Sequence, residues 1–233
     1  MAAILVLITL LAQVALGPVI PADFGKPVNE VVSQNSLGQL ESRLKSQYAA
    51  IEKLFASPPN SREVPRSTYG RLLREWQDDL AQSFGRAAAT VEDILALNPP
   101  NREMWQERLD TLRLYSQPVR SPDQRTVYGS GEVQQSARIL ETPLAVYADE
   151  ARAAKIHGAV RLRLVLASDG TVRNVFPIKS LGHGLTESAR AAARQIKFEP
   201  AVRNGGPASQ FETLVYEFEK GQSQKPYIPR TVF

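Results

Sequence analysis

The sequence predicts an α+β protein in which an all-α bundle precedes a small domain with a three-stranded antiparallel sheet and two helices. Three observations support this prediction. Apolar residues recur at steps of three and four between residues 37 and 115, which is the period of an amphipathic helix. Between residues 160 and 219 they alternate with polar residues in three segments, which is the period of a strand. A stretch rich in Pro, Gly, Ser and Gln separates the two patterns at residues 117–140 and predicts a linker.

Composition excludes several classes of protein. With 43% hydrophobic and 22% charged residues, the chain of 233 residues has the composition of a globular protein and not of a disordered one. It has no cysteine, which excludes a disulfide framework, a thiolate nucleophile and every sulfur-ligated metal site. The net charge of +4 is too small to indicate binding to nucleic acid. We expect no nucleic-acid partner, no cofactor and no metal site.

The chain begins with an apolar segment, residues 2–16, interrupted only by Thr9 and Gln13 and ended by Gly17-Pro18. It has the length of a signal-peptide core and is shorter than the roughly 20 residues that a membrane span needs. Residues 1–22 therefore have three interpretations, namely a cleaved signal peptide, an uncleaved inner-membrane anchor or a buried core helix. The first two place the rest of the chain outside the cytoplasm.

Residues 23–116 are predicted to form a helical bundle with three apolar stripes. The spacing of Ser36 and Gln39 is that of a capping box and predicts that the first helix begins there. Thr90 with Asp93 predicts a separate short helix after the second stripe, and Asn101 predicts the cap of the last helix. The repeated Pro-Pro-Asn at residues 58–60 and 99–101 indicates either two helix breaks or a degenerate helical repeat with a partner-binding surface.

Residues 141–220 carry the strand pattern. Val160–Leu166 alternates, with leucines inward and arginines in water, and Asp169-Gly170 predicts a tight hairpin to the returning strand Val172–Ile178. Pro177 cannot donate to a ladder and therefore predicts an edge strand. A helix follows, and then a third strand, Phe211–Glu219. If the first strand is central, the third strand is also an edge, whose free amides and carbonyls form a template for an added strand.

Several short motifs in this region occur in a fixed order. They are Pro143 to Tyr147, Ile156-His157-Gly158, Asp169-Gly170-Thr171-Val172, Ala189 to Ala193, Ile196-Lys197-Phe198-Glu199-Pro200-Ala201 and Gly206-Pro207. In this order they resemble the carboxy-terminal domain of the TonB family, over about a third of the chain. The helical region shows no such resemblance, and residues 221–233 are a tail beyond it.

The resemblance implies a periplasmic domain of Gram-negative bacteria, either released by signal cleavage or attached to the inner membrane by residues 1–22. Family members bind a short peptide, the TonB box, from the plug of an outer-membrane TonB-dependent transporter. They pair it with their last strand by β-augmentation, in energy-dependent transmembrane transport driven by the inner-membrane ExbB–ExbD complex. Carried over to this chain, the peptide-binding residues are Phe211, Glu212, Thr213, Leu214, Val215, Tyr216, Glu217 and Phe218.

Three arginines on the first two strands indicate a second candidate binding surface on the sheet. Arg161, Arg163 and Arg173 form either a basic face for an acidic peptide or lipid headgroups, or an ordinary solvated sheet face. We also expect residues 141–233 to fold alone, with a strand-exchanged homodimer as the alternative association state.

Energy coupling is the point at which the chain departs from the family. The family's anchor helix carries a histidine that couples to ExbB–ExbD, whereas the only two histidines here, His157 and His183, lie far from residues 1–22. We therefore expect peptide binding without use of the proton gradient. The alternative function is a non-energised envelope scaffold or adaptor whose helical bundle carries the main interaction. An enzyme is not expected, because two loop histidines cannot supply a nucleophile, a base and a group that orients them.

Overall fold

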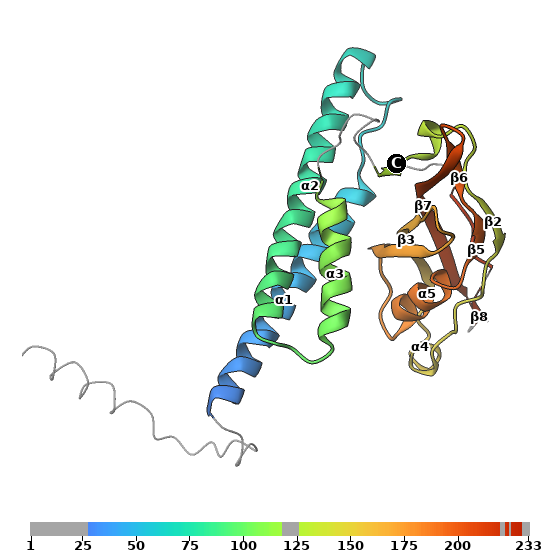
Figure 1. Ribbon diagram of the computed structural model, residues 1–233. Coiled ribbons are helices and arrows are strands. Elements are labelled where there is room, and N and C mark those ends of the chain that lie inside the picture. Colours follow the sequence, from blue (N-terminus) through green and yellow to red (C-terminus); the bar gives the residue numbers. More distant parts are fainter. Residues whose placement is uncertain (1–27, 118–125, 220–221, 224, 230–233) are drawn as a thin grey trace, which may run out of the picture. The chain divides into compact units, whose positions relative to one another are not determined.

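The computed structural model describes residues 28–117, 126–219, 222–223 and 225–229, with side chains from residue 36 onward. The expected signal peptide or anchor, residues 1–22, lies outside the described residues. The chain divides into two compact units, residues 1–36 and 37–233, and the packing described below is that of the second. In chain order the elements are α1 (Val28–Ala56), α2 (Arg66–Ala96), α3 (Arg102–Tyr115), β1 (Val127–Tyr128), η2 (Ser130–Glu132), β2 (Arg138–Glu141), α4 (Asp149–Ala153), β3 (Gly158–Leu166), β4 (Val172–Lys179), α5 (Leu185–Ala193), β5 (Lys197–Glu199), β6 (Ala201–Arg203), β7 (Gly206–Glu219) and β8 (Gln222–Ser223) (Figure 1).

Two of the first three helices are longer than predicted. α1 begins at Val28, so Ser36 lies inside the helix and the predicted capping box is wrong. α2 runs without a break through Thr90 to Ala96, so the separate short helix is wrong as well. The Thr90 hydroxyl donates to the carbonyl oxygen of Arg86, 3.2 Å away, which is a bond that threonine makes inside a helix rather than at its start. α3 begins after Asn101, as predicted, although Asn101 makes no side-chain cap bond.

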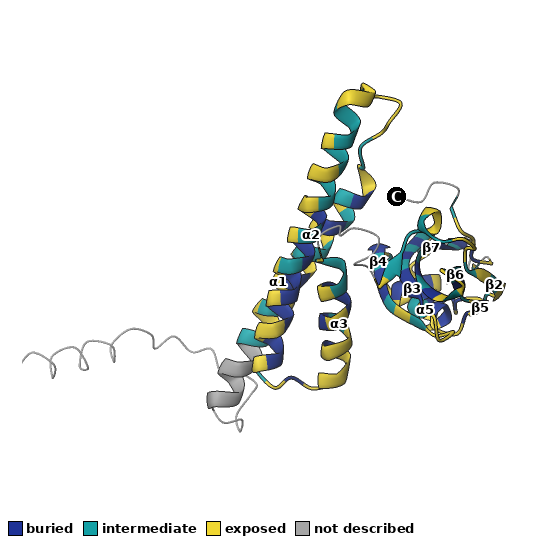
Figure 2. Ribbon diagram, turned by 45° about the horizontal axis from the view of Figure 1, so that its top comes forward, coloured by how far each residue is buried: buried dark blue, intermediate teal, exposed yellow. Residues whose placement is uncertain are grey.

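The apolar stripes of the helices pack into one core, and the buried parts of the helices are dark blue in Figure 2. Its centre is Phe84, which is 2% exposed. The ring centroid of Phe84 lies 5.2 Å from that of Tyr115 and 4.9 Å from that of Phe176. Trp76 packs edge-on against Phe55 and donates its indole N–H to the carbonyl oxygen of Leu54, 2.9 Å away. Trp76 is therefore a packing residue of this core.

The antiparallel centre of the sheet is as predicted, because β3 pairs with β4 on one side and with β7 on the other. The number of strands differs from the three that the sequence predicts. The sheet has six strands, since β1, β6 and β8 also pair with β7, and β2 and β5 form a separate two-stranded sheet. Strands of two to four residues are too short to show a clear period of two, which is why the sequence pattern did not predict them.

The sheet contributes to two cores, because successive side chains of a strand point to opposite faces. Leu162 and Leu164 of β3 pack with Leu214 of β7 and the alanines of α5 in one core. On β4, Val175 belongs to this core, whereas Phe176 and Ile178 belong to the core of the helices. The side chains of β4 thus connect α1–α3 to the sheet within the second unit.

Part of the predicted linker pairs with the C-terminal domain. β1, η2 and β2 all lie within residues 126–141, and the Ala137 amide donates to Oε1 of the buried Gln210, 2.9 Å away. Gln135 forms an isolated bridge with Val202. Residues 118–125 lie outside the described residues. We therefore propose that the C-terminal fold begins at residue 126, whereas the sequence alone predicts that it begins at residue 141.

We expect a fragment of residues 126–233 to unfold at a higher urea concentration than a fragment of residues 141–233. The shorter fragment leaves Gln210 buried without the Ala137 amide, and an unmade buried hydrogen bond costs about 1–3 kcal/mol. Both fragments uncover Phe176 and Ile178, so we expect either of them to associate. Urea titration followed by circular dichroism and sedimentation velocity measures both effects. Equal unfolding midpoints would contradict a structural role for residues 126–140.

Candidate peptide-binding edge

β7 contains all eight residues that the sequence predicts to bind a peptide. Its pairing with β3 runs from Gln210 opposite Leu166 to Phe218 opposite Gly158. The side chains of Leu214, Tyr216 and Phe218 are buried in the core beside α5. An added peptide would therefore meet the backbone of β7 and not these three side chains.

The alternate residues of β7 face the other side of the sheet. The Phe211 ring centroid lies 5.7 Å from that of Tyr115 at the end of α3, and the guanidinium carbon of Arg163 lies 5.0 Å from the Phe211 centroid. Thr213 and Val215 are buried, and Glu217 is half-buried. This face of β7 is therefore partly covered by the C-terminal end of α3.

The outer side of β7, away from β3, is occupied at several positions by the chain itself. Gln210, Val215 and Phe218 each pair with β3 on one side and with another segment on the other. These partners are Tyr128 of β1, Tyr227 of the tail and Ser223 of β8. The prediction that the third strand has an open outer side is therefore wrong at these positions.

The central one of these contacts is a single antiparallel pair. The Val215 amide donates to the carbonyl oxygen of Tyr227, 2.9 Å away, and the Tyr227 amide donates to the carbonyl oxygen of Val215, 3.1 Å away. The Tyr227 hydroxyl donates to Oε1 of Glu217 at 2.9 Å, and this bond raises the pKa of Tyr227. Pro226 and Pro229 flank the pairing residue, and neither has an amide proton. Pro229, two residues after Tyr227, therefore cannot donate to β7, whereas the nitrogen of Pro226 faces away from β7.

A buried polar group lies beside the same edge. Oε1 of Glu212 accepts a hydrogen bond from the Thr213 amide at 2.9 Å, and Oε2 accepts one from Nε2 of Gln210 at 3.4 Å. Burial raises the pKa of Glu212, while these two bonds and the charge of Arg163 lower it. Thr213 is two residues from Val215, so its amide faces the outer side of β7. That amide is already bonded to the Glu212 carboxylate.

The three arginines of the predicted basic face do not share one solvated surface. Arg163 is half-buried against Phe211, and burial lowers the pKa of its guanidinium, so the expectation of an arginine in water is wrong there. Arg161 is half-buried, and its Nε atom has no hydrogen-bond partner among the described residues. Arg173 is exposed and forms an ion pair with Asp169.

Other chemistry can be considered only for the described part of the chain. It contains no group of three or more His, Cys, Asp or Glu side chains that could hold a metal ion. His157 and His183 are both exposed loop residues. No helix within residues 28–117 and 126–229, as far as these are described, is long and apolar enough to cross a membrane.

The comparison with protein families identifies the C-terminal part of the chain. Residues 143–219 match the family described as Gram-negative bacterial TonB protein C-terminal. This match confirms the predicted resemblance over about a third of the chain. It supports a class of protein similar to TonB-type energy transducers, which belong to the bacterial envelope and serve transport rather than catalysis. A search of curated proteins found no match to the chain.

Sequence reasoning missed the residues that cover the edge. Three short segments pair with β7 over only one or two residues each. They are Val127-Tyr128, Gln222-Ser223 and Tyr227. One signal was available, because Tyr227-Ile228 is one of the two apolar pairs in the tail, the other being Val232-Phe233. Such a pair often marks a contact with the folded domain, although its partner cannot be known from the sequence.

Proposed function

We propose that the C-terminal domain captures an extended peptide by adding it as a strand to the outer side of β7. The expected ligand is the TonB box of an outer-membrane transporter plug, and the expected place of action is the periplasm. Binding residues are the backbone groups of Phe211–Phe218. Every second side chain of the peptide would lie on the sheet face that carries Val215 and Glu217.

The observation that carries this proposal is the pair between Val215 and Tyr227. Two hydrogen bonds between the same two residues are the pattern of a hydrogen-bonded antiparallel pair. The outer amide and carbonyl of Val215 therefore already accept a strand at this position. A peptide with an amide proton two residues after its pairing residue would extend the ladder where Pro229 prevents the tail from doing so.

The backbone amides of β7 alternate in direction, so single proline substitutions can test strand addition. The amides of Thr213, Val215 and Glu217 face the outer side, whereas those of Leu214 and Tyr216 face β3. Glu217→Pro removes one of these outward amides. We expect this variant to stay folded and to bind a fluorescent plug peptide at least about fivefold more weakly, because one backbone hydrogen bond contributes about 1 kcal/mol. Fluorescence anisotropy measures the affinity.

Glu217→Ala is the matched control, because it removes the same carboxylate and keeps the amide. Both variants lose the Tyr227–Glu217 hydrogen bond, so their difference reports the backbone alone. Leu214→Pro should unfold the domain, since that amide faces β3. A folded Glu217→Pro variant that binds as tightly as Glu217→Ala would overturn strand addition at this edge.

The alternative function, a non-energised scaffold whose helices carry the main interaction, is favoured by one observation. The outer side of β7 is already paired with the chain's own residues at Gln210, Val215 and Phe218. A plug peptide that fails to bind wild-type protein, and fails again after removal of residues 222–233, would support this alternative.

Coupling to ExbB–ExbD is not part of the proposal. Residues 1–22, where the family's anchor helix would lie, contain no histidine and fall outside the described residues. Peptide capture needs only the C-terminal domain, so the two questions are independent.

A further inference from the structure

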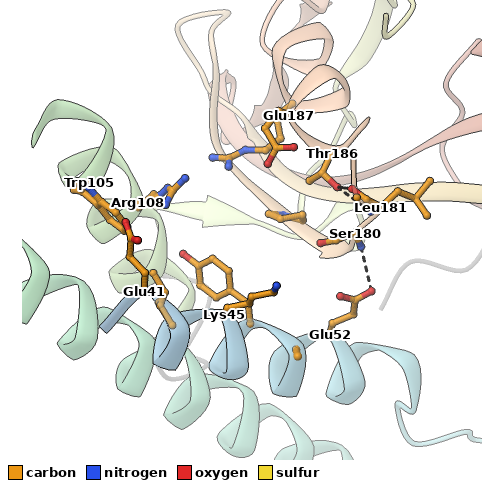
Figure 3. Close-up of a pocket in the computed structure, with 15 residues that line it drawn as sticks. Glu41, Lys45, Glu52, Trp105, Arg108, Ser180, Leu181, Thr186 and Glu187 are labelled. Atoms are coloured by element: carbon orange, nitrogen blue, oxygen red, sulfur yellow. Dashed lines mark hydrogen bonds between the residues drawn. The ribbon is translucent and has the colours of Figure 1, made fainter. Parts of the chain in front are cut away.

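A pocket of about 540 Å³ lies between α1, α3 and the segment from the end of β4 into α5, all within the second unit. This volume is in the range of pockets that hold small organic molecules. Figure 3 shows Glu41, Lys45 and Glu52 on its α1 side and Trp105 and Arg108 on its α3 side. The pocket is separate from the outer side of β7, which contributes no residue to its lining.

The apolar part of the lining is held by the core of the helices. Leu44 and Trp105 are 3% and 4% exposed, so their positions are fixed by packing. The ring of Tyr48 packs edge-on against Phe176, with centroids 5.3 Å apart. These side chains form a preorganised apolar wall that a ligand would not need to assemble.

Two arginines form a cationic corner in this pocket, defined here as Arg108 and Arg190. The guanidinium carbon of Arg108 lies 4.6 Å from the centroid of the Trp105 ring. The Nε atom of Arg190 is buried and has no hydrogen-bond partner among the described residues. Leaving a buried donor without an acceptor costs free energy, which here applies to the Nε atom of Arg190.

The charges around Arg190 point to a negatively charged acceptor. Burial lowers the pKa of Arg190, and the positive charges of Arg194 and Arg108 lower it further. Glu107, which raises that pKa, is held by Arg194 in an ion pair of 2.5 Å. An anion placed between Arg108 and Arg190 would relieve the repulsion between these like charges.

The carboxylates that line the pocket do not meet this need. They are Glu41, Glu52 and Glu187, and in the described part of the chain none of them forms an ion pair with Arg108 or Arg190. Glu52 instead accepts a hydrogen bond from the Ser180 amide at 3.1 Å, drawn as a dashed line in Figure 3.

We propose that this pocket binds a small organic carboxylate with an apolar body. The carboxylate would accept hydrogen bonds from Arg108 and Arg190, because guanidinium groups match carboxylates in geometry. The apolar body would lie along Leu44, Tyr48 and Trp105. Since the walls come from α1, α3 and α5, the bound ligand would also stabilise the contact between the helices and the sheet.

The test uses the full chain and two probes, decanoate and 4-phenylbutyrate, in isothermal titration calorimetry. We expect saturable binding of at least one carboxylate, and at least about tenfold weaker binding of the matching alcohol, since hydrogen bonds to charged groups are the stronger class. Arg108→Gln and Arg190→Gln should each weaken carboxylate binding by a similar factor. Arg113→Gln is the matched control, because Arg113 lies on the same helix and pairs with Glu92 outside the pocket.

The outcomes separate this site from other causes of binding. Thermal melting of each variant shows whether it is folded, and Arg108→Gln serves as the second variant if Arg190→Gln is not. Alcohol and carboxylate binding with equal affinity, or loss of affinity in Arg113→Gln equal to that in Arg108→Gln, would overturn the proposal. So would the absence of saturable binding by both carboxylates.

Discussion

Phe176→Ala is expected to lower the free energy of unfolding by about 3–5 kcal/mol, the range measured for removal of a buried aromatic ring. Phe176 is 3% exposed, and although it lies on β4 it packs among the helices. Its ring contacts those of Tyr48, Phe84 and Tyr115, with centroids between 4.9 and 6.0 Å away. Urea unfolding of the full chain measures the loss.

The controls for this variant separate ring packing from other effects. Phe176→Leu keeps most of the apolar volume, so we expect a smaller loss, of about 1 kcal/mol. Val146→Ala changes a side chain that is 74% exposed and should have almost no effect. A loss below about 1 kcal/mol for Phe176→Ala would mean that the sheet does not depend on the helices. In that case residues 126–233 should be as stable alone as in the full chain.

Long periodic segments could be predicted from the sequence, because each carries its own signal. The alternation at Val160–Leu166 predicts a half-buried strand, and β3 is the central strand of the sheet. Pro177 predicts that the returning strand lies at an edge, and β4 pairs only with β3 among the described strands. These predictions depend on local patterns, which can be recognised in a single sequence.

Contacts between distant segments could not be predicted in this way. Arg163 alternates with leucines like a solvated residue, yet Phe211 and Tyr115 cover it. Periodicity shows which face of a strand a residue lies on, but not whether another element covers that face. The same limit applies to β7, which is an edge if the sheet has three strands, although its outer side is in fact paired with β1 and β8.

Removal of residues 222–233 is expected to raise the affinity of the chain for a plug peptide by about 5- to 150-fold. Under the proposed function the tail would be an intramolecular competitor, because it holds the amide and the carbonyl of Val215 to which the peptide would pair. Its two backbone hydrogen bonds together contribute about 1–3 kcal/mol. The apparent affinity for a peptide equals the intrinsic affinity multiplied by the fraction of molecules in which the edge is free. Fluorescence anisotropy with wild-type and truncated chains measures the difference.

Point variants of Tyr227 identify the bonds that are responsible. Tyr227→Pro removes one of the two backbone bonds and should give part of the gain, whereas Tyr227→Phe removes only the hydroxyl bond to Glu217 and should give little. The two variants therefore distinguish backbone competition from side-chain packing. If truncation leaves the affinity unchanged, the peptide does not compete for Val215. If truncation lowers it, residues 222–233 belong to the binding site itself, and the tail would then be a partner of the peptide rather than its competitor.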